Sequence, residues 1–303
     1  MSEDTAEHER QQKNQGIIAL VVVQICFGLF PLFGKLTMEG FDPRALAGWR
    51  MLFGALILGG YAFFRLGKRA FPTWPDLFRL QICAFLGISV NQVLYLEGLQ
   101  RAPTVNAALV MCLIPVLTLI IAIMIRQEKF EKGRALGTLI AFAGLVYLVV
   151  HRGVDLDDAY LQGNLLMCAN ALSYSIYLVY SRPLSRRYPA YVVIGWVFIL
   201  STWQVPLFIG GAEFFPEAAS TDSWLALVYV LLFPTTLAYF LNVFALARVR
   251  ASTTAIFIFS QPIIAAIAAL LFLDEPLTAA TIFSGIAIFV GIWLASGRSK
   301  PRQ

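Results

Sequence analysis

Two charged residues, Arg50 and Glu97, lie inside long apolar stretches of the sequence. A charge within the hydrocarbon of a bilayer costs roughly 2.5 to 3.5 kcal/mol on insertion scales, so each residue needs a partner or water. At a rise of 1.5 Å per helical residue, Arg50 lies about 10 Å and Glu97 about 6 Å from the same membrane face. We therefore expect first a salt bridge between them, serving as a structural tie or gate. Contact of Arg50 with a bound carboxylate, and snorkelling of its charge to the interface, remain alternatives.

Neutral polar and aromatic side chains recur in the same apolar stretches, often three or four residues apart, which places them on one face of a helix. Such groups can bind a small solute without a large desolvation cost. The alternative is that they only hydrogen-bond neighbouring helices. Together with Arg50, the candidate binding residues are Gln24, Asn91, Tyr95, Asn106, Tyr174, Tyr177, Trp203, Tyr239, Asn242 and Gln261.

Prolines inside the apolar stretches are candidate hinges. Each proline frees the backbone carbonyl four residues earlier, which can bind a solute or let the helix bend. Static packing is the alternative role, because proline is tolerated in spanning helices. The candidate hinge residues are Pro31, Pro115 and Pro262, and Glu97 is the candidate gate residue.

Catalytic and metal chemistry have little support in this sequence. Its two histidines, His8 and His151, lie outside the apolar stretches, and there is no motif such as H-E-x-x-H. We therefore expect no catalytic residue, no metal and no cofactor. Glu97 is the one carboxylate within the stretches that could couple transport to protons, a role that a facilitator does not need.

The apolar stretches themselves point to a membrane protein. The chain has 303 residues, 59% hydrophobic and only 14% charged, whereas a soluble domain is about 25% charged. A spanning helix needs roughly 20 mostly apolar residues. We predict an all-α membrane protein with ten transmembrane helices, near residues 16–38, 44–64, 78–99, 103–125, 133–150, 159–180, 190–211, 222–245, 251–273 and 277–296.

Basic residues predict the orientation, because they favour the cytoplasmic side of a membrane. Few lie on one side of the predicted topology: Lys35, Arg44, Arg101 and Arg152. Many more lie on the side that holds both termini, among them Arg10, Lys13, Arg65, Lys68, Arg126, Lys132, Arg182, Arg186, Arg248, Arg250, Arg298 and Lys300. Both termini are therefore expected in the cytoplasm. The net charge of +5 is explained by this topology, and no nucleic-acid partner is expected.

A shift of the chain by 147 positions aligns its two halves without a gap. The matches include Gly16 with Gly163, Arg101 with Arg248, Pro115 with Pro262 and Gly144 with Gly291. Since five is an odd number of spans, the second copy enters the membrane from the opposite face. Inverted repeats are typical of transporters that open a midplane site alternately to either side. We predict a polar tail, a first repeat, a second repeat and a basic tail at residues 1–15, 16–151, 159–297 and 298–303.

The order of these motifs resembles the drug/metabolite transporter superfamily, in particular its EamA-type members with two five-helix units. The similar segments are FGLFPLFGK, DPRALAGWRMLFGALIL and NQVLYLEGLQRAPTVNAALVMCLIPVLTLIIAIMIRQE, with the last repeated in part as ALARVRASTTAIFIFSQPIIAAIAALLFLDEP. One departure is Val197, which stands in the second unit where the first has Arg50. The role of that arginine therefore cannot be assumed twice.

The resemblance implies a central cavity lined by helices 1 to 4 and 6 to 9, with helices 5 and 10 at the periphery. It also implies a secondary transporter or exporter of small metabolites in the bacterial inner membrane, working by alternating access. Amino acids or related compounds are the first expected substrates, since NQVLYLEGL is similar to a segment of members that carry amino acids. Nucleotide precursors or drugs are the alternative substrates. A membrane-embedded enzyme or a structural membrane protein is the less favoured reading.

Overall fold

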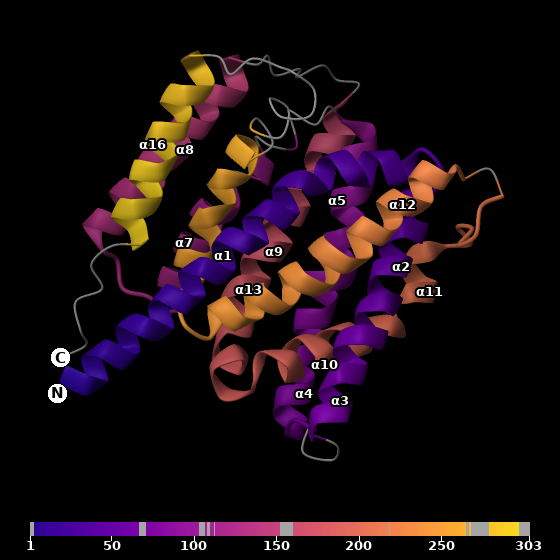
Figure 1. The fold of residues 1–303 in the computed structure, drawn as a ribbon, viewed down its shortest axis with the longest axis horizontal. Helices are drawn as coiled ribbons and strands as arrows, with labels where there is room; N and C mark the ends of the chain where they lie inside the picture. Colours follow the sequence, from indigo (N-terminus) through magenta and orange to yellow (C-terminus); the bar gives the residue numbers. More distant parts are fainter. Residues whose placement is uncertain are drawn as a thin grey trace.

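The computed structural model describes residues 3–66, 71–102, 107, 110–111, 113–151, 160–217, 219–264, 267 and 279–296. Every regular element in this part of the chain is helical, which confirms the all-α fold (Figure 1). Each of the ten predicted spans contains helical residues, and most boundaries agree within a few positions.

Helices of the first repeat follow the predicted spans closely. Span 2 is one continuous helix made of α2, η1 and α3, and span 3 is made of α4, η3 and α5, where η1 and η3 are π-helical turns. The elements are α1 (Glu3–Met38), α2 (Pro43–Gly54), η1 (Ala55–Gly59), α3 (Gly60–Leu66), α4 (Trp74–Ala84), η3 (Phe85–Ser89), α5 (Val90–Arg101), α7 (Leu113–Met124) and α8 (Lys132–His151).

The second repeat has a similar series of helices, with a π-helical turn in span 8 and a 3-10 turn in span 9. The elements are α9 (Leu161–Arg187), α10 (Ala190–Thr202), α11 (Val205–Ile209), α12 (Thr221–Val230), η5 (Leu231–Leu237), α13 (Ala238–Leu246), α14 (Ala251–Ile256), η6 (Phe257–Ser260) and α16 (Ala279–Ser296).

The predicted polar tail is not separate from the first helix, because α1 begins at Glu3. The acidic residue Glu7 stands near the start of α1, where the positive end of the helix dipole favours a negative charge. Apolar content marks where a helix can enter lipid, but it does not mark where the helix starts. Residues 298–303, the predicted basic tail, lie outside the described part of the chain.

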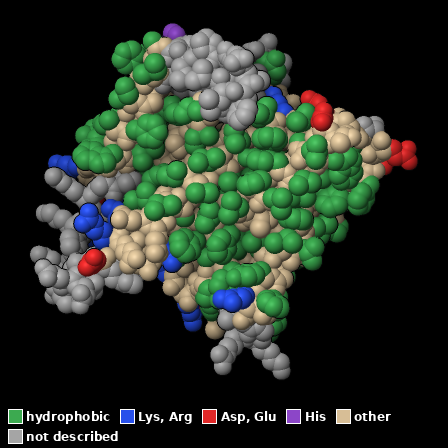
Figure 2. Space-filling view, viewed as in Figure 1, with side chains coloured by type: hydrophobic (Ala, Val, Ile, Leu, Met, Phe, Trp, Pro, Cys, Tyr) green, Lys and Arg blue, Asp and Glu red, His purple; other side chains and the backbone are tan. Residues whose placement is uncertain are grey.

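Hydrophobic side chains cover the visible surface of the bundle in a broad band, and most visible basic side chains lie along its left and lower edges (Figure 2). A soluble monomer rarely exposes so large an apolar patch. Four helical segments are long and apolar enough to cross a bilayer, namely Arg10–Met38, Pro43–Arg65, Trp74–Arg101 and Thr221–Leu246. The chain is a multi-pass membrane protein.

Local sequence signals explain where several helices begin. At α2, the Asp42 side chain accepts a hydrogen bond from the Arg44 backbone N–H, and Pro43 occupies the first turn. At α12, the Ser220 side chain accepts from the Ser223 backbone N–H. Both arrangements satisfy N–H groups that a helix start leaves without a partner.

Interruptions of the helices recur in both repeats. The 147-residue shift places the π-helical turn η3 on residues 232–236, which lie within η5. It also places η1 on residues 202–206, where α10 gives way to α11. π-Helical turns are rare and are often found at functional sites. The duplication therefore extends to the irregular parts of the helices.

Two helix contacts that exchange partners show the two-fold relation between the repeats. A Cβ atom added to Gly16 would lie 3.1 Å from Arg248 Cβ, and one added to Gly163 would lie 3.0 Å from the Arg101 carbonyl carbon. The 147-residue shift aligns Gly16 with Gly163 and Arg101 with Arg248. The first helix of each repeat therefore packs on the third helix of the other.

Helices α8 and α16 reveal the direction of the two-fold axis. A Cβ atom on Gly137 would meet the Gly291 carbonyl oxygen at 2.6 Å, and one on Gly144 would meet the Ser284 carbonyl oxygen at 3.3 Å. The residue numbers thus rise along α8 as they fall along α16, so these corresponding helices are antiparallel. An axis that relates them lies in the membrane plane, which makes the repeats inverted. The pair lies at one edge of the bundle, as the family resemblance implied (Figure 1).

Candidate functional site

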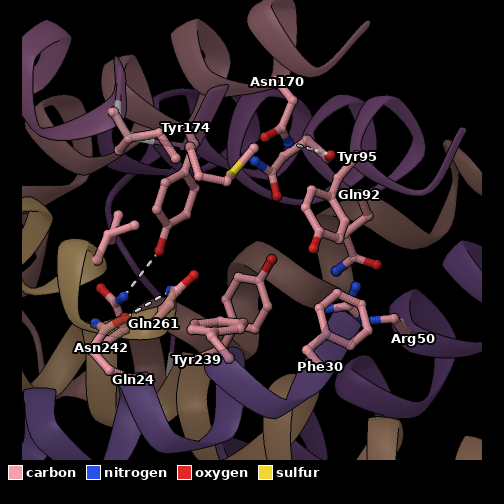
Figure 3. A pocket seen from close by; sticks show the side chains of 15 residues that line it. Gln24, Phe30, Arg50, Gln92, Tyr95, Asn170, Tyr174, Tyr239, Asn242 and Gln261 are labelled. Atoms are coloured by element: carbon pink, nitrogen blue, oxygen red, sulfur yellow. Dashed lines mark hydrogen bonds between the residues drawn. The ribbon is translucent and has the colours of Figure 1, made fainter. Parts of the chain in front are cut away.

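A pocket lies between the two repeats at the centre of the bundle (Figure 3). About 610 Å³ of space among its lining side chains is not filled by protein atoms, its open mouth included. The lining side chains are Gln24, Phe27, Phe30, Arg50, Asn91, Gln92, Tyr95, Met111, Ile114, Asn170, Tyr174, Tyr239, Asn242, Ile258 and Gln261.

Most of the residues expected to bind a solute meet at this pocket. They come from helices of both repeats, at positions far apart in the sequence. The structure brings together Gln24, Arg50, Asn91, Tyr95, Tyr174, Tyr239, Asn242 and Gln261.

Three expected residues are not found at the pocket. Trp203 is 59% exposed and donates from Nε1 to Gln81 Oε1 at 3.1 Å, so its assignment to the cavity is wrong. It follows the last residue of α10, where the helix breaks and directs the indole outward. Tyr177 is buried but packs against Gly87, where an added Cβ would lie 2.3 Å from its ring. Asn106 lies outside the described residues.

Sequence reasoning missed two polar residues of the lining, Gln92 and Asn170. Asn170 stands four positions before Tyr174, so the helical spacing that selected Tyr174 applies to it as well. Its Nδ2 donates to the Asn91 backbone oxygen at 2.7 Å. Gln92 follows Asn91 directly, and a spacing of one gives no sign that both residues reach the same cavity.

Arg50 enters one end of the pocket from α2 and is only 2% exposed. Its Nε donates to the Thr235 hydroxyl at 2.9 Å, and its guanidinium carbon lies 4.4 Å from the centre of the Phe30 ring. In the part of the chain that the structure describes, no carboxylate forms an ion pair with Arg50. The pocket therefore carries a positive charge that is held in place by neutral groups.

The expected salt bridge between Arg50 and Glu97 is wrong. Glu97 instead accepts from Arg44 Nε at 2.5 Å and also pairs with Arg101. Arg101 is one helical turn from Glu97 on α5, and Arg44 lies in the first turn of α2, nearer the helix end than Arg50. The structure therefore separates the ion cluster at the end of the bundle from the charge in the pocket.

Polar side chains with hydrogen-bond partners form the other end of the pocket. Gln261 Nε2 donates to Gln24 Oε1 at 2.7 Å, and Asn242 Nδ2 donates to the Tyr174 hydroxyl at 2.9 Å (Figure 3). Asn242 Oδ1 is buried and has no hydrogen-bond partner among the described residues. A buried polar atom without a partner is costly, so a hydrogen bond from a donor on a bound solute would stabilise this oxygen.

The candidate hinge prolines lie in different local structures. Helix α1 continues without interruption through Pro31. Pro115 stands near the first described turn of α7, and Pro262 follows the 3-10 turn η6. Their use as hinges, and that of Glu97 as a gate, remain predictions.

A buried ion cluster joins the two repeats beyond the pocket. Glu128 accepts from the Ser252 backbone N–H at 3.2 Å and from its hydroxyl, and it also accepts from Arg134 Nη1 at 3.0 Å. The neighbouring Glu131 pairs with Arg134 and Arg250. Partial burial acts to raise the pKa of Glu131, but the hydrogen bond from Arg250 and the charges of Arg134 and Arg250 hold that pKa below its usual range. The cluster ties the loop before α8 to the start of α14.

Comparison with known proteins places both repeats in one family. The model of the EamA-like transporter family matches residues 14–150 and again residues 161–297. The WAT1-related protein At3g18200 of Arabidopsis thaliana is 24% identical, over 96% of this chain and 84% of its own length. The uncharacterized transporter YdfC of Bacillus subtilis is 25% identical, over 84% of this chain and 82% of its own. A solved crystal structure with 21% identity has a TM-score of 0.75 and covers 94% of this chain and 96% of that chain. It supports the fold alone.

Proposed function

Since the chain belongs to the EamA-like transporter family, a family of membrane transporters and not of enzymes, we propose that it is a secondary transporter or exporter of small metabolites that works by alternating access. Amino acids or related compounds are the first substrate class. The observation that carries the proposal is a pocket lined by both inverted repeats. Two similar halves of opposite orientation can exchange conformations, and the pocket between them then opens to one membrane face or the other.

The pocket's chemistry favours amino acids over the alternative substrates. Aromatic rings and aliphatic side chains form much of the wall, amides and hydroxyls supply hydrogen bonds, and Arg50 supplies one positive charge. A nucleotide precursor that carries a phosphate would bring up to two negative charges against this single cation of the described lining. A zwitterion or a monoanion matches the site better.

The proposed location is the bacterial inner membrane, with both termini in the cytoplasm. The support is the basic residues at one end of the bundle. Gly16 packs on Arg248 at this end, and Arg250 pairs with Glu131 close by. Among the described residues, fewer basic side chains occupy the end that contains Lys35 and Arg44, and basic residues favour the cytoplasmic side.

Transport in proteoliposomes tests the proposed function. Purified protein is reconstituted with an internal pool of each unlabelled amino acid, and uptake of the labelled compound by exchange is measured beside protein-free liposomes. We expect exchange at least about ten-fold above the protein-free rate for some members of the panel. Nucleosides and cationic drugs are tested in parallel. Absence of exchange for every solute, with protein that is monodisperse and folded, contradicts the proposal.

A further inference from the structure

The positive charge of Arg50 has no negative partner in the described structure of the pocket. An isolated charge removed from water costs several kcal/mol even after the protein relaxes. Arg50 is 2% exposed, and the partners described for it are the Thr235 hydroxyl and the face of Phe30. Neither partner carries a negative charge. The empty site is therefore poised to gain from an anion that enters with the solute.

The π-helical turn η5 holds the guanidinium in one orientation. The Thr235 hydroxyl donates to the Val230 carbonyl oxygen, five residues earlier, at 2.7 Å. Its proton is thus committed, so the oxygen can accept from Arg50 Nε at 2.9 Å. This bond occupies one edge of the guanidinium and leaves the terminal nitrogens for the pocket. A planar carboxylate can accept from two such nitrogens at once.

Unpaired polar atoms lie at both ends of the pocket. Neither the amide nitrogen nor the oxygen of Gln92 has a hydrogen bond of normal geometry in the described structure, although Tyr239 lies within range of an interaction. Gln92 lies beside Arg50, whereas Asn242 lies at the opposite end with Tyr239 between (Figure 3). One end thus offers the donors of Arg50 and of the Gln92 amide, and the other offers the acceptor Asn242 Oδ1, which has no partner among the described residues.

Because the donors and the acceptor lie at opposite ends, we propose that the pocket selects solutes with a single carboxylate and binds them in one orientation. This inference rests on the proposed transport function. The carboxylate accepts hydrogen bonds from Arg50 and the Gln92 amide. A donor on the solute, such as an ammonium group, points to Asn242 Oδ1. The apolar part of the solute lies between the aromatic walls. Thr235 is a positioning residue that acts through Arg50.

The internal repeat makes this orientation unique. The 147-residue shift places Val197 at the position of Arg50 and Phe244 at that of Glu97. Val197 is buried and apolar, so the second repeat has no equivalent anion site at this position. A solute that carries one carboxylate therefore binds at the Arg50 end and not at the symmetry-related place.

Matched ligand pairs test the carboxylate site in purified protein. The probes are leucine with leucinamide, isocaproate with isocaproamide, and hydrocinnamate with hydrocinnamamide, with affinity measured by thermal shift titration or calorimetry. Wild-type protein is expected to bind the carboxylate at least about ten-fold more tightly than the amide in each pair that binds. Equal affinity for the two members of the pairs, or no binding of any carboxylate, overturns the proposal.

Variants separate the individual roles. Arg50→Gln is expected to remove the carboxylate preference. Thr235→Val is expected to reduce that preference several-fold, whereas Thr235→Ser, which keeps the hydroxyl, is expected to retain it. If the threonine had a purely structural role, neither variant would change the ratio of carboxylate affinity to amide affinity. If Arg50→Gln does not fold, the affinities of the ligand pairs for wild-type protein and for the two Thr235 variants still test the proposal.

A second comparison tests the orientation. Leucine is expected to bind wild-type protein more tightly than isocaproate, which lacks the ammonium group. Asn242→Leu is expected to abolish this difference and to keep the preference for carboxylate over amide. Loss of both preferences, or of neither, contradicts the orientation. Carboxylate binding without exchange in proteoliposomes would reject the transport proposal alone, and exchange without carboxylate preference would reject this inference alone.

Discussion

Arg50 Nε donates a hydrogen bond to the Thr235 hydroxyl at 2.9 Å. This bond joins α2 of the first repeat to η5 of the second repeat. Thr235 belongs to η5, whose counterpart η3 immediately precedes the segment of α5 that supplies Asn91 and Tyr95. The irregular turns of both repeats thus lie beside the pocket. They free side chains and backbone groups from regular helix geometry at the place where a solute would bind.

The close crossing of α8 and α16 depends on glycine. A methyl group on Gly137 would lie 2.6 Å from the Ala295 nitrogen and from the Gly291 carbonyl oxygen. We expect Gly137→Ala to destabilise the protein by about 1–3 kcal/mol, the usual cost of overpacking. The measurement is the unfolding temperature in detergent.

The matched control for this substitution is Gly133→Ala on the same helix, where an added Cβ meets nothing within 4 Å. Alanine favours a helix by up to about 1 kcal/mol over glycine, so this variant is expected to keep or slightly raise the unfolding temperature. Equal temperatures for the two variants would show that α8 and α16 do not pack as described.

The carboxylate of Glu128 is buried against Arg134, which is also buried, and against the start of α14. Glu128→Gln leaves Arg134 with only Glu131 as an ion partner in the described structure. Breaking a buried ion pair typically costs about 3–5 kcal/mol, and the remaining partner reduces that cost, so we expect a loss of about 2–4 kcal/mol.

Denaturant unfolding of reconstituted protein measures this loss, with Glu217→Gln as the control. Glu217 is exposed, and removal of its charge is expected to change stability by less than about 0.5 kcal/mol. If the Glu128→Gln protein were as stable as the control, the contacts of Glu128 between the repeats would not contribute to the free energy of unfolding.

Gln261 and Trp203 distinguish a pocket residue from a surface residue. Gln261 lines the pocket and donates to Gln24 Oε1, so Gln261→Leu leaves Gln24 without this partner and makes the wall apolar. We expect exchange of the best substrate to fall about ten-fold, corresponding to about 1.4 kcal/mol. Trp203→Phe changes a side chain on the outer surface and is expected to keep the rate within two-fold. The reverse order of effects would place the solute path elsewhere.

Hydropathy and charge were sufficient to predict the helices that cross the membrane, because lipid requires each span to be long, apolar and helical. The repeat predicted the inverted arrangement, since the matching glycines permit the close contacts that exchange between the halves. The π-helical turns were not predicted. Only Pro234 within η5 gives a local sign of one, and the other turns arise from how neighbouring helices pack.

The sequence predicted which residues line the pocket more accurately than it predicted their orientations and partners. Spacing along a helix identifies which residues share a face, but it does not show which way that face turns. Arg50 and Glu97 were expected to pair because their depths are similar, yet Arg44 and Arg101 lie nearer to Glu97. Trp203 was assigned to the cavity on residue type, whereas the helix break beside it directs the ring outward.

Cysteine accessibility tests most directly whether the pocket between the inverted repeats opens to both sides of the membrane. In protein with its native cysteines replaced by alanine, Asn91→Cys is treated with an impermeant thiol reagent from either face of sealed vesicles, with the lipid-facing Leu139→Cys as control. We predict labelling of Asn91→Cys from both faces, slowed by a transported solute, and none of the control. Labelling from one face only, whether or not solute is present, would contradict alternating access through this pocket.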